Sequence, residues 1–180
     1  MKITREHLAE NRRHLLDAAA RLLRAKGPEN VSVAEVTKAA GLTHGAFYNH
    51  FRSKDDLITQ AFAHVLRDGP ARPPPDLAAF ARHYLRREHR DNRGEGCMFA
   101  ALAAEVPRLS PEAQAVMTQA LKGLIERLSV NAPGETPAER RRAAISHWAA
   151  MVGALVLARA VDDPVLSDEL LEETLRSCPA

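Results

Sequence analysis

Signals that start α-helices recur along the whole chain, and they constrain its fold more than any other feature. Ser32 and Ser53 each stand three residues before a carboxylate, a spacing that caps the free N–H groups of a first helical turn. Ser110 and Thr136 each precede a proline, which suits the first helical position because its missing N–H has no partner there. No run of residues alternates with the period of two that marks a strand. The sequence therefore predicts an all-α fold.

Further signals set the bounds of about nine predicted helices. Gly27 and Gly41 follow segments with apolar residues at helical spacing, as glycines after helix ends do. The proline-rich segment Asp68–Asp76 is the clearest linker. The helices are predicted over residues 5–26, 33–40, 44–51, 54–67, 76–90, 96–106, 111–129, 137–161 and 165–176.

Charge is unevenly distributed, although the net charge of the 180-residue chain is only +2. Residues 1–54 hold ten Lys/Arg and five Asp/Glu, whereas residues 55–180 hold fifteen and eighteen. A basic first third suggests that one end meets a polyanion, and a solvated helix face would explain the same pattern nearly as well.

Several classes of protein are disfavoured by what the chain holds. The charged opening residues do not resemble a signal peptide, and the longest apolar run, Trp148–Ala158, is about half of a membrane span. Two cysteines make no disulfide framework. The histidine pairs His44/His50 and His83/His89 are each six residues apart, about 240° around a helix, so neither pair chelates a metal from one face. We expect a cytoplasmic protein that does not span a membrane, with no catalytic site, metal or cofactor.

The first three predicted helices have the plan of a helix-turn-helix, a short helix and turn followed by a second short helix. Phe47 and Phe51 are four apart and form the buried side of the third helix, whereas Tyr48 lies about 100° away from Phe47. Gly45 costs about 1 kcal/mol relative to alanine in a helix, but it lets a partner approach the backbone closely. The opposite face is polar and small, as a recognition helix in a major groove requires; it carries Thr43, His44, Gly45, Tyr48 and Asn49, with His50 at its edge.

The segment from about Arg12 to Leu66 resembles the DNA-binding domain of the tetracycline-repressor (TetR) family of bacterial transcriptional regulators. The motifs that carry this resemblance are LLDAAARLL, VSVAEVTKAAGLTHGAFYNHF and SKDDL. Thr37 departs from the alanine usual in the family, and its hydroxyl is expected to bond to a carbonyl one turn earlier. The resemblance implies a three-helix DNA-binding domain over residues 1–53, a connecting helix over 54–67, and a helical ligand-binding and dimerisation domain over 54–180.

The resemblance also implies which residues touch double-stranded operator DNA. Phosphate contacts are expected from one set, which includes the starts of the second and fourth helices, where free N–H groups suit a phosphate. Base contacts are expected from three residues of the third helix, and Ala46 is placed near a thymine methyl. The phosphate set is Ser32, Thr43, Tyr48, His50 and Lys54; the base set is His44, Gly45 and Asn49.

In the second domain the family encloses a small-molecule effector and dimerises through its last two long helices, which resemble residues 153–161 and 166–175 here. For each candidate taken alone, ordinary core packing is the favoured alternative to a place in the cavity wall. The candidate cavity residues are Phe62, His64, Tyr84, Cys97, Phe99, Met117, His147 and Trp148. The candidate interface residues are Trp148, Val152, Gly153, Val156, Leu170 and Leu171.

The function expected is that of a ligand-responsive transcriptional repressor that binds a palindromic operator as a homodimer and is released by a small molecule. An architectural DNA-binding protein would share the basic first third without needing a ligand. A sensor of electrophiles or oxidants acting through Cys97 is the other alternative, because a cysteine near a helix N-terminus has its thiolate favoured by the helix dipole.

Overall fold

The structure, a computed structural model, describes residues 4–67 and 77–178. Those residues form helices and no strand, so the all-α prediction is confirmed, with ten α-helices in place of about nine. The predicted linker over residues 68–76 lies outside the described ranges. The α-helices are α1 (Arg5–Lys26), α2 (Val33–Ala39), α3 (His44–Phe47), α4 (Lys54–Arg67), α5 (Leu77–Tyr84), α6 (Arg87–Asp91), α7 (Met98–Leu102), α8 (Pro111–Val130), α9 (Pro137–Ala160) and α10 (Pro164–Ser177); the short 3₁₀ turns are η1 (Arg93–Glu95) and η2 (Val106–Arg108).

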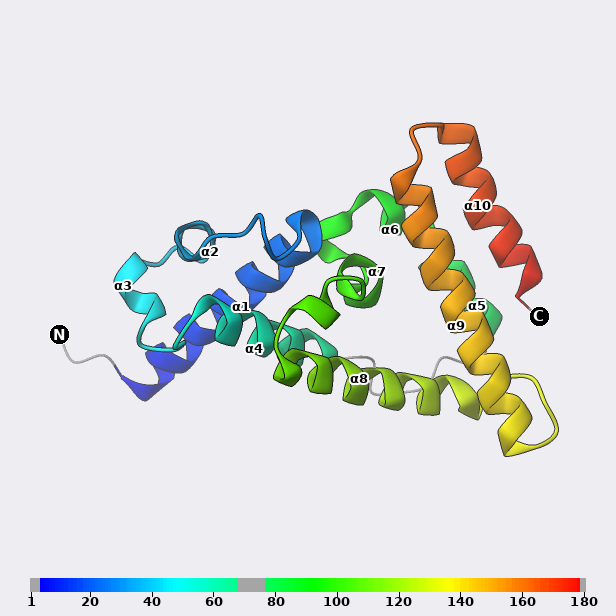
Figure 1. Cartoon of the computed structure of the whole chain (residues 1–180), viewed down its shortest axis with the longest axis horizontal. Helices are drawn as coiled ribbons and strands as arrows, with labels where there is room; N and C mark the ends of the chain where they lie inside the picture. The colour runs from blue at the N-terminus through cyan, green and yellow to red at the C-terminus, as the bar shows by residue number, and fades with distance from the viewer. Residues whose placement is uncertain (1–3, 68–76, 179–180) are drawn as a thin grey trace.

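The helices lie in an elongated arrangement, and different helices form its two ends (Figure 1). Helices α1, α2 and α3 form one end, and the antiparallel pair α9 and α10 forms the other. Helix α4 packs against both α1 and α8, and α8 continues along the molecule to pack against α9. Two long helices therefore connect the end that carries the helix-turn-helix to the opposite end.

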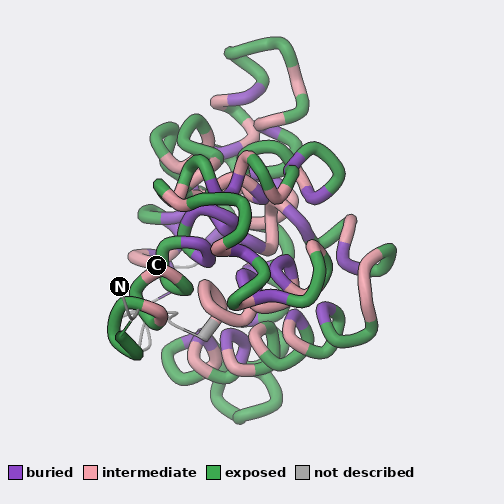
Figure 2. The backbone as a smooth tube through the Cα atoms, turned by 90° about the vertical axis from the view of Figure 1, so that its left-hand side faces the viewer, coloured by how far each residue is buried: buried purple, intermediate pink, exposed green. Residues whose placement is uncertain are grey.

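Two clusters of buried side chains hold these helices together, and the buried segments lie on the inner sides of the helices (Figure 2). The first cluster joins the three N-terminal helices to α4, α7 and the start of α8, with Phe47 and Phe62 among its largest members. The second joins α5 and the end of α8 to α9 and α10, around Trp148 and Leu155. The first cluster contains residues from both sides of the predicted domain boundary at residue 54. Helix α4 therefore packs against α1 as well as against α7 and α8.

Most helix starts follow the predicted caps. The Ser110 and Thr136 hydroxyls each accept a backbone N–H, and Thr136 forms a complete capping box with Glu139. The Ser32 hydroxyl accepts the N–H of Glu35, but the Glu35 carboxylate binds Lys26 and leaves the box half formed. All three of these helices therefore begin directly after their predicted caps, although the capping box at Ser32 is incomplete.

The helix predicted over residues 76–90 is instead two helices with a break at Leu85 and Arg86. Arg86 is extended, with φ −79° and ψ 150°. Its Nε donates to the carbonyl of His83, and the His89 ring lies against the carbonyl of Tyr84 at 2.5 Å from Nδ1. Side chains thus satisfy the last carbonyls of α5, which lets the chain turn without a glycine or proline. The helix predicted over 96–106 is likewise shortened, to α7.

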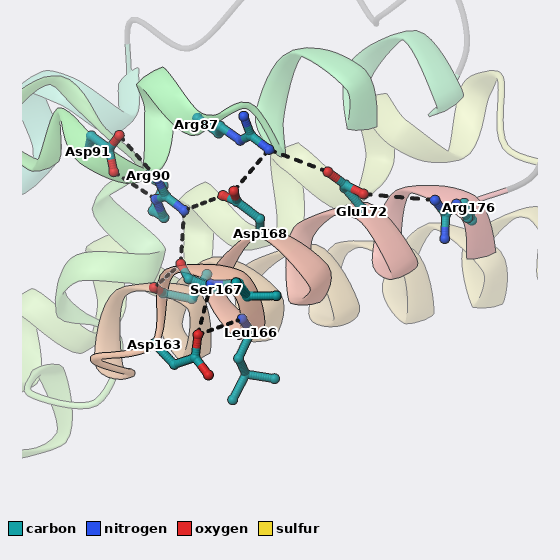
Figure 3. A network of polar contacts seen from close by, with 11 residues as sticks. Arg87, Arg90, Asp91, Asp163, Leu166, Ser167, Asp168, Glu172 and Arg176 are labelled. Carbon is teal, nitrogen blue, oxygen red and sulfur yellow. Dashed lines mark hydrogen bonds and ion pairs between the residues drawn. The ribbon is translucent and has the colours of Figure 1, made fainter.

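Polar contacts fix α10 against α6 and α9 (Figure 3). Arg90 donates to Ser167 Oγ and pairs with Asp168 at 2.7 Å, and Arg87 pairs with the other oxygen of Asp168 at 2.9 Å. Ser167 Oγ in turn donates to the carbonyl of Ala158 in α9 at 2.6 Å. The α9–α10 pair is therefore held in one orientation relative to α6.

Helix α9 is, among the described residues, the one helix long and apolar enough to cross a membrane by length and composition alone. Its most apolar window has a mean hydropathy of 1.4, and 33% of that window is buried within the chain. The core helix of a water-soluble fold passes the same test. Because α9 packs against α8 and α10 and carries Trp148 into the second cluster, its apolar character has a use inside this fold.

Candidate functional site

In α3 and the turn that follows it, the phenylalanines are buried and the tyrosine is exposed. Phe47 and Phe51 are 1% and 2% exposed, whereas Tyr48 is 64% exposed. The Tyr48 ring stands edge-on to Phe47 at 5.1 Å and to His44 at 5.6 Å. The predicted division between a core face and a polar face is therefore present, although the regular helix ends at Phe47 and a turn replaces its predicted last residues.

The polar face of α3 is open to solvent. Thr43, His44, Gly45 and Asn49 are exposed, and Ala46 is partly exposed. No heavy atom of the described residues lies within 4 Å of the position that a Cβ on Gly45 would occupy. The protein by itself therefore has no steric need for glycine at this position. A partner that approaches the backbone of α3 closely would create that need.

The two predicted phosphate positions that flank α3 are at helix starts. Ser32 is exposed at the start of α2. Lys54 is the first residue of α4. The N–H of Asp56, two residues further along, donates to Ser53 Oγ at 3.1 Å. Lys54 has no ion-pair partner within the described ranges. Its ammonium is thus free to bind an external anion.

His50 is placed differently from the other candidates. Its Nε2 is buried and has no hydrogen-bond partner within residues 4–67 and 77–178. Burial lowers the pKa of His50, and the nearby Arg12 guanidinium lowers it further. His50 is therefore held neutral beside α1, with one ring nitrogen turned away from the exposed face.

A cavity of about 440 Å³ lies among helices α4 to α9, each of which contributes residues to its wall. An aromatic cluster forms one wall: Trp148 stands edge-on to Tyr84 at 5.1 Å and to Phe99 at 5.6 Å, and Phe80 lies 5.9 Å from Tyr84. Four of the eight candidate cavity residues line it, namely Tyr84, Cys97, Phe99 and Trp148.

The other four candidates do not line this cavity. Phe62 and Met117 are buried in the first cluster, on the side of α4 and α8 that packs under the helix-turn-helix. His64 faces α1, where its Nε2 lies 2.7 Å from Asp17. The His147 ring bonds to the carbonyl of Ala143 on its own helix. Residue type alone could not distinguish these positions from those of the wall.

Most of the other lining residues were missed from the sequence, and two of them, Phe80 and Arg127, bear on what the cavity can bind. Phe80 is four residues before Tyr84, and this spacing on one helix face was a signal that could have included it. Arg127 also borders the cavity, and its Nε is buried without a hydrogen-bond partner in the described part of the chain. Nothing in the sequence distinguishes Arg127 from the many arginines on solvated faces.

Cys97 lacks the low thiol pKa that a reactive cysteine requires. It is the residue before α7, but its N–H is donated to His89 Nε2 at 3.0 Å. Desolvation raises the pKa of the Cys97 thiol, and the neighbouring Tyr84 hydroxyl lowers it to a smaller extent. Neutral, half-buried thiols react slowly, so the geometry disfavours a sensor that acts through this residue.

The predicted interface residues point in two directions. Trp148 and Leu171 are 6% and 2% exposed and belong to the second cluster, so neither offers a surface for a second chain. Val156 is 41% exposed, and Gly153 has open space where a Cβ would stand. Val152 and Leu170 are partly buried against the second cluster. The outer side of α9 and α10 also exposes apolar side chains that were not predicted, namely Ile145, Leu157, Val165 and Leu166.

The fold and this site define a helix-turn-helix protein whose second helical half encloses a cavity. Residues 15–61 match the family model described as bacterial regulatory proteins, tetR family. The N-terminal part of the chain, which contains α2 and α3, is therefore similar to the DNA-binding domain of TetR-family regulators.

Relatives of known name agree with this assignment over part of their length. The transcriptional regulator AcrR of Shigella flexneri is 44% identical over 57 residues, which are 32% of this chain and 26% of AcrR. The transcriptional repressor NemR of Escherichia coli is 26% identical over 131 residues, 67% of this chain and 66% of NemR. The matches to these relatives thus span less than two thirds of their lengths.

Solved structures share the whole fold. The reduced form of Escherichia coli NemR superposes with a TM-score of 0.72 over 94% of this chain and 98% of that one, at 24% identity. A TetR-family regulator from Agrobacterium tumefaciens gives 0.72 over 96% and 100%, at 20% identity. At these identities the likeness establishes the arrangement of helices and nothing more specific.

Proposed function

We propose that this protein is a cytoplasmic transcriptional repressor that binds operator DNA through α3 and releases it when a small molecule enters the cavity. Residues 1–53 form the DNA-binding domain in this proposal, and residues 54–180 form the ligand-binding and dimerisation domain. The observation that carries it is the exposed polar face of α3, with Gly45 open and Lys54 unpaired beside it. A polyanion with readable edges is the partner that such a face suits.

The roles on this face follow from chemistry and position. Exposed Ser32, Thr43 and Tyr48 hydroxyls and the Lys54 ammonium can donate to phosphates, which fix the register of the protein on the duplex. His44, Asn49 and the Gly45 backbone reach base edges, and Ala46 meets a thymine methyl. His50 is assigned a phosphate contact only through Nδ1, because its Nε2 is buried.

A second copy of this chain is the partner proposed for the outer side of α9 and α10. Ile145 and Val156 are eleven residues apart, about three helical turns, and so share the face on which Gly153 lies open. A two-fold operator needs two recognition helices, and an isologous contact of this face with itself would supply them. Burying this face would also remove its apolar side chains from water.

Helix α4 is the element through which cavity and DNA would be coupled. Its first residue, Lys54, is at the DNA-facing end, and Val65 and Leu66 near its other end line the cavity. A ligand that displaces α4 would change the spacing of the two recognition helices. Coupling of this kind is typically worth 1–3 kcal/mol, and DNA must weaken ligand binding by the same factor.

Sequencing of the genomic DNA fragments that the pure protein captures tests the proposal. A small set of fragments that share an inverted repeat is expected for the wild-type protein, and none for a Gly45→Leu variant of equal thermal stability. Capture of all fragments alike would instead identify an architectural protein.

A further inference from the structure

The cavity combines an apolar wall with polar groups that the protein itself leaves unsatisfied. The rings of Tyr84, Phe99 and Phe80 surround Trp148, with centroids 5.1, 5.6 and 6.1 Å from that of Trp148. The Tyr84 hydroxyl is buried in this wall, and among the described residues its one near polar neighbour is the Cys97 sulfur, a weak hydrogen-bonding group. Buried polar groups are nearly always paired, so a hydroxyl whose one near partner is a sulfur can still bond to a polar group of a molecule in the cavity.

Arg127 is the second unsatisfied group. Its Nε is buried without a partner, and no carboxylate of the described chain pairs with its guanidinium. The side chain folds back along α8, where its Nη1 would lie 3.3 Å from a Cβ on Gly123. Gly123 therefore leaves room, in the middle of a long helix, for a guanidinium that contacts no acid of its own protein.

The other charged residues that line the cavity supply no carboxylate that pairs with Arg127. Glu95 is exposed at the rim and faces Arg24 at 3.7 Å. Glu88 is also exposed at the rim, together with His83 and Arg86. Burial lowers the pKa of His89, so this ring is held neutral. Among the residues that line the cavity, Arg127 is thus the half-buried cation with no acid paired to it in the described part of the chain. The Arg159 guanidinium, which lies near Tyr84 and Cys97, donates to the carbonyls of Arg90 and His89.

We propose that the cavity binds an amphipathic organic acid, with its carboxylate on Arg127 and the Tyr84 hydroxyl and its planar apolar body against Phe80, Phe99 and Trp148. A guanidinium donates in a fork that fits a carboxylate, and a phenol adds a third donor. The aromatic wall removes the apolar body from water. This inference rests on the proposed function of the cavity as the effector site and names the class of effector.

Three probes with one ring system and different heads test the ligand class. They are 2-naphthoate, 2-naphthalenemethanol and 2-naphthylmethylammonium, titrated into the full chain. Trp148 is the single tryptophan, so quenching of its fluorescence, corrected for the absorbance and emission of the naphthyl group, reports binding in the cavity. The carboxylate is expected to bind about tenfold more tightly than the alcohol, as a hydrogen bond to a charged group allows, and the ammonium most weakly. Equal binding of carboxylate and alcohol, tighter binding of the ammonium, or binding of none would overturn the proposal.

Variants assign the effect to the two donors. Arg127→Met should remove the preference for the carboxylate, and Lys122→Met, which removes the same charge from an exposed position on α8, should retain it. Tyr84→Phe keeps the ring and should weaken the carboxylate several-fold while leaving the alcohol unchanged. This second variant deletes a buried hydroxyl whose one near polar neighbour is a sulfur, so it tests the proposal even if Arg127→Met fails to fold. An unchanged preference in Tyr84→Phe and Arg127→Met would overturn it.

DNA release is measured separately, on an operator fragment from genomic capture. A carboxylate that binds by tryptophan quenching but does not release DNA supports the ligand class and contradicts the proposed coupling to DNA. Release by the alcohol and the carboxylate at equal concentrations supports the coupling and contradicts the ligand class.

Discussion

Single residues decide how this chain would meet DNA, and Gly45 is the sharpest case. The space around its missing side chain is open in the free protein. Gly45→Ala should therefore leave the free energy of unfolding unchanged or raise it by up to about 1 kcal/mol, the helix preference of alanine over glycine. Operator affinity should fall by about 1–3 kcal/mol, the value of one good base contact. Chemical denaturation and fluorescence anisotropy with labelled operator measure the two quantities.

Gly41 provides the matched control, because its φ of +70° is a conformation that favours glycine. Gly41→Ala should lower the free energy of unfolding itself. If Gly45→Ala retained full operator affinity, close approach of DNA to the backbone of α3 would be ruled out.

Lys54 is the residue whose charge should appear in the salt dependence. Because its ammonium has no partner in the described part of the chain, Lys54→Ala should weaken binding to all DNA sequences about equally and reduce the salt slope by about one unit. His44→Ala should instead change which operator bases matter. Binding isotherms at several salt concentrations measure the slope, with Lys122→Ala as a charge-matched control. A slope in Lys54→Ala equal to that of the control would exclude the phosphate contact.

His89 should make the stability of the fold depend on pH. Burial lowers its pKa, and its neutral ring accepts the Cys97 N–H through Nε2. The unfolded chain, with a histidine pKa of about 6.5, binds more protons than the folded chain below that pH. Stability should be complete above pH 6.5 and fall as the pH drops below it, and His50 acts in the same direction. The unfolding midpoint should drop less between pH 7.5 and 5.5 in His89→Gln; equal drops would show that His89 does not titrate in this range.

At the scale of elements, the bounds with strong local signals were predicted and those set by side-chain bonds were not. Helices α2, α4, α8 and α9 begin directly after their predicted caps. The predicted bond of Thr37 is present as well, from its hydroxyl to the carbonyl of Ala34 at 3.0 Å. The break after α5 was missed because Arg86 and His89 create it through contacts with carbonyls, which no local residue preference signals.

The orientation of α9 shows the same limit. Apolar residues surround this helix, so the sequence placed Trp148 both in the cavity and at the interface. In the fold Trp148 is turned inward by Phe80, Tyr84 and Phe99, and the outer face carries Ile145 and Val156 in its place. Only packing against α5 and α7 decides which side of an apolar helix is the inner one.

Gly153 tests the outer face of α9. Since a side chain there meets open space within the chain, Gly153→Leu should leave the monomer fold intact. It should lower dimerisation and operator affinity together, because a bulky side chain would separate two closely packed helices. Sedimentation velocity and anisotropy measure both, with Lys122→Leu on α8 as the control. Sedimentation of the wild-type chain as a monomer at micromolar concentration would remove the support for a two-fold protein.

At the scale of the whole molecule, the proposed regulator has a DNA site and an effector site joined by α4, and a two-fold axis would double both. The first hydrophobic cluster fixes α3 to α4 and α7, and the second fixes the cavity wall to α9 and α10. A rigid connection of this kind lets a ligand at one end alter the distance between two copies of α3 at the other.

Hydroxyl-radical footprinting of a captured operator tests this central claim most directly, because it maps both recognition helices on one DNA molecule. For a dimer with two recognition helices, two protected patches related by a two-fold axis are expected, with centres about 34–36 Å apart, one turn of the duplex. A single protected patch, or uniform protection along the fragment, would contradict it.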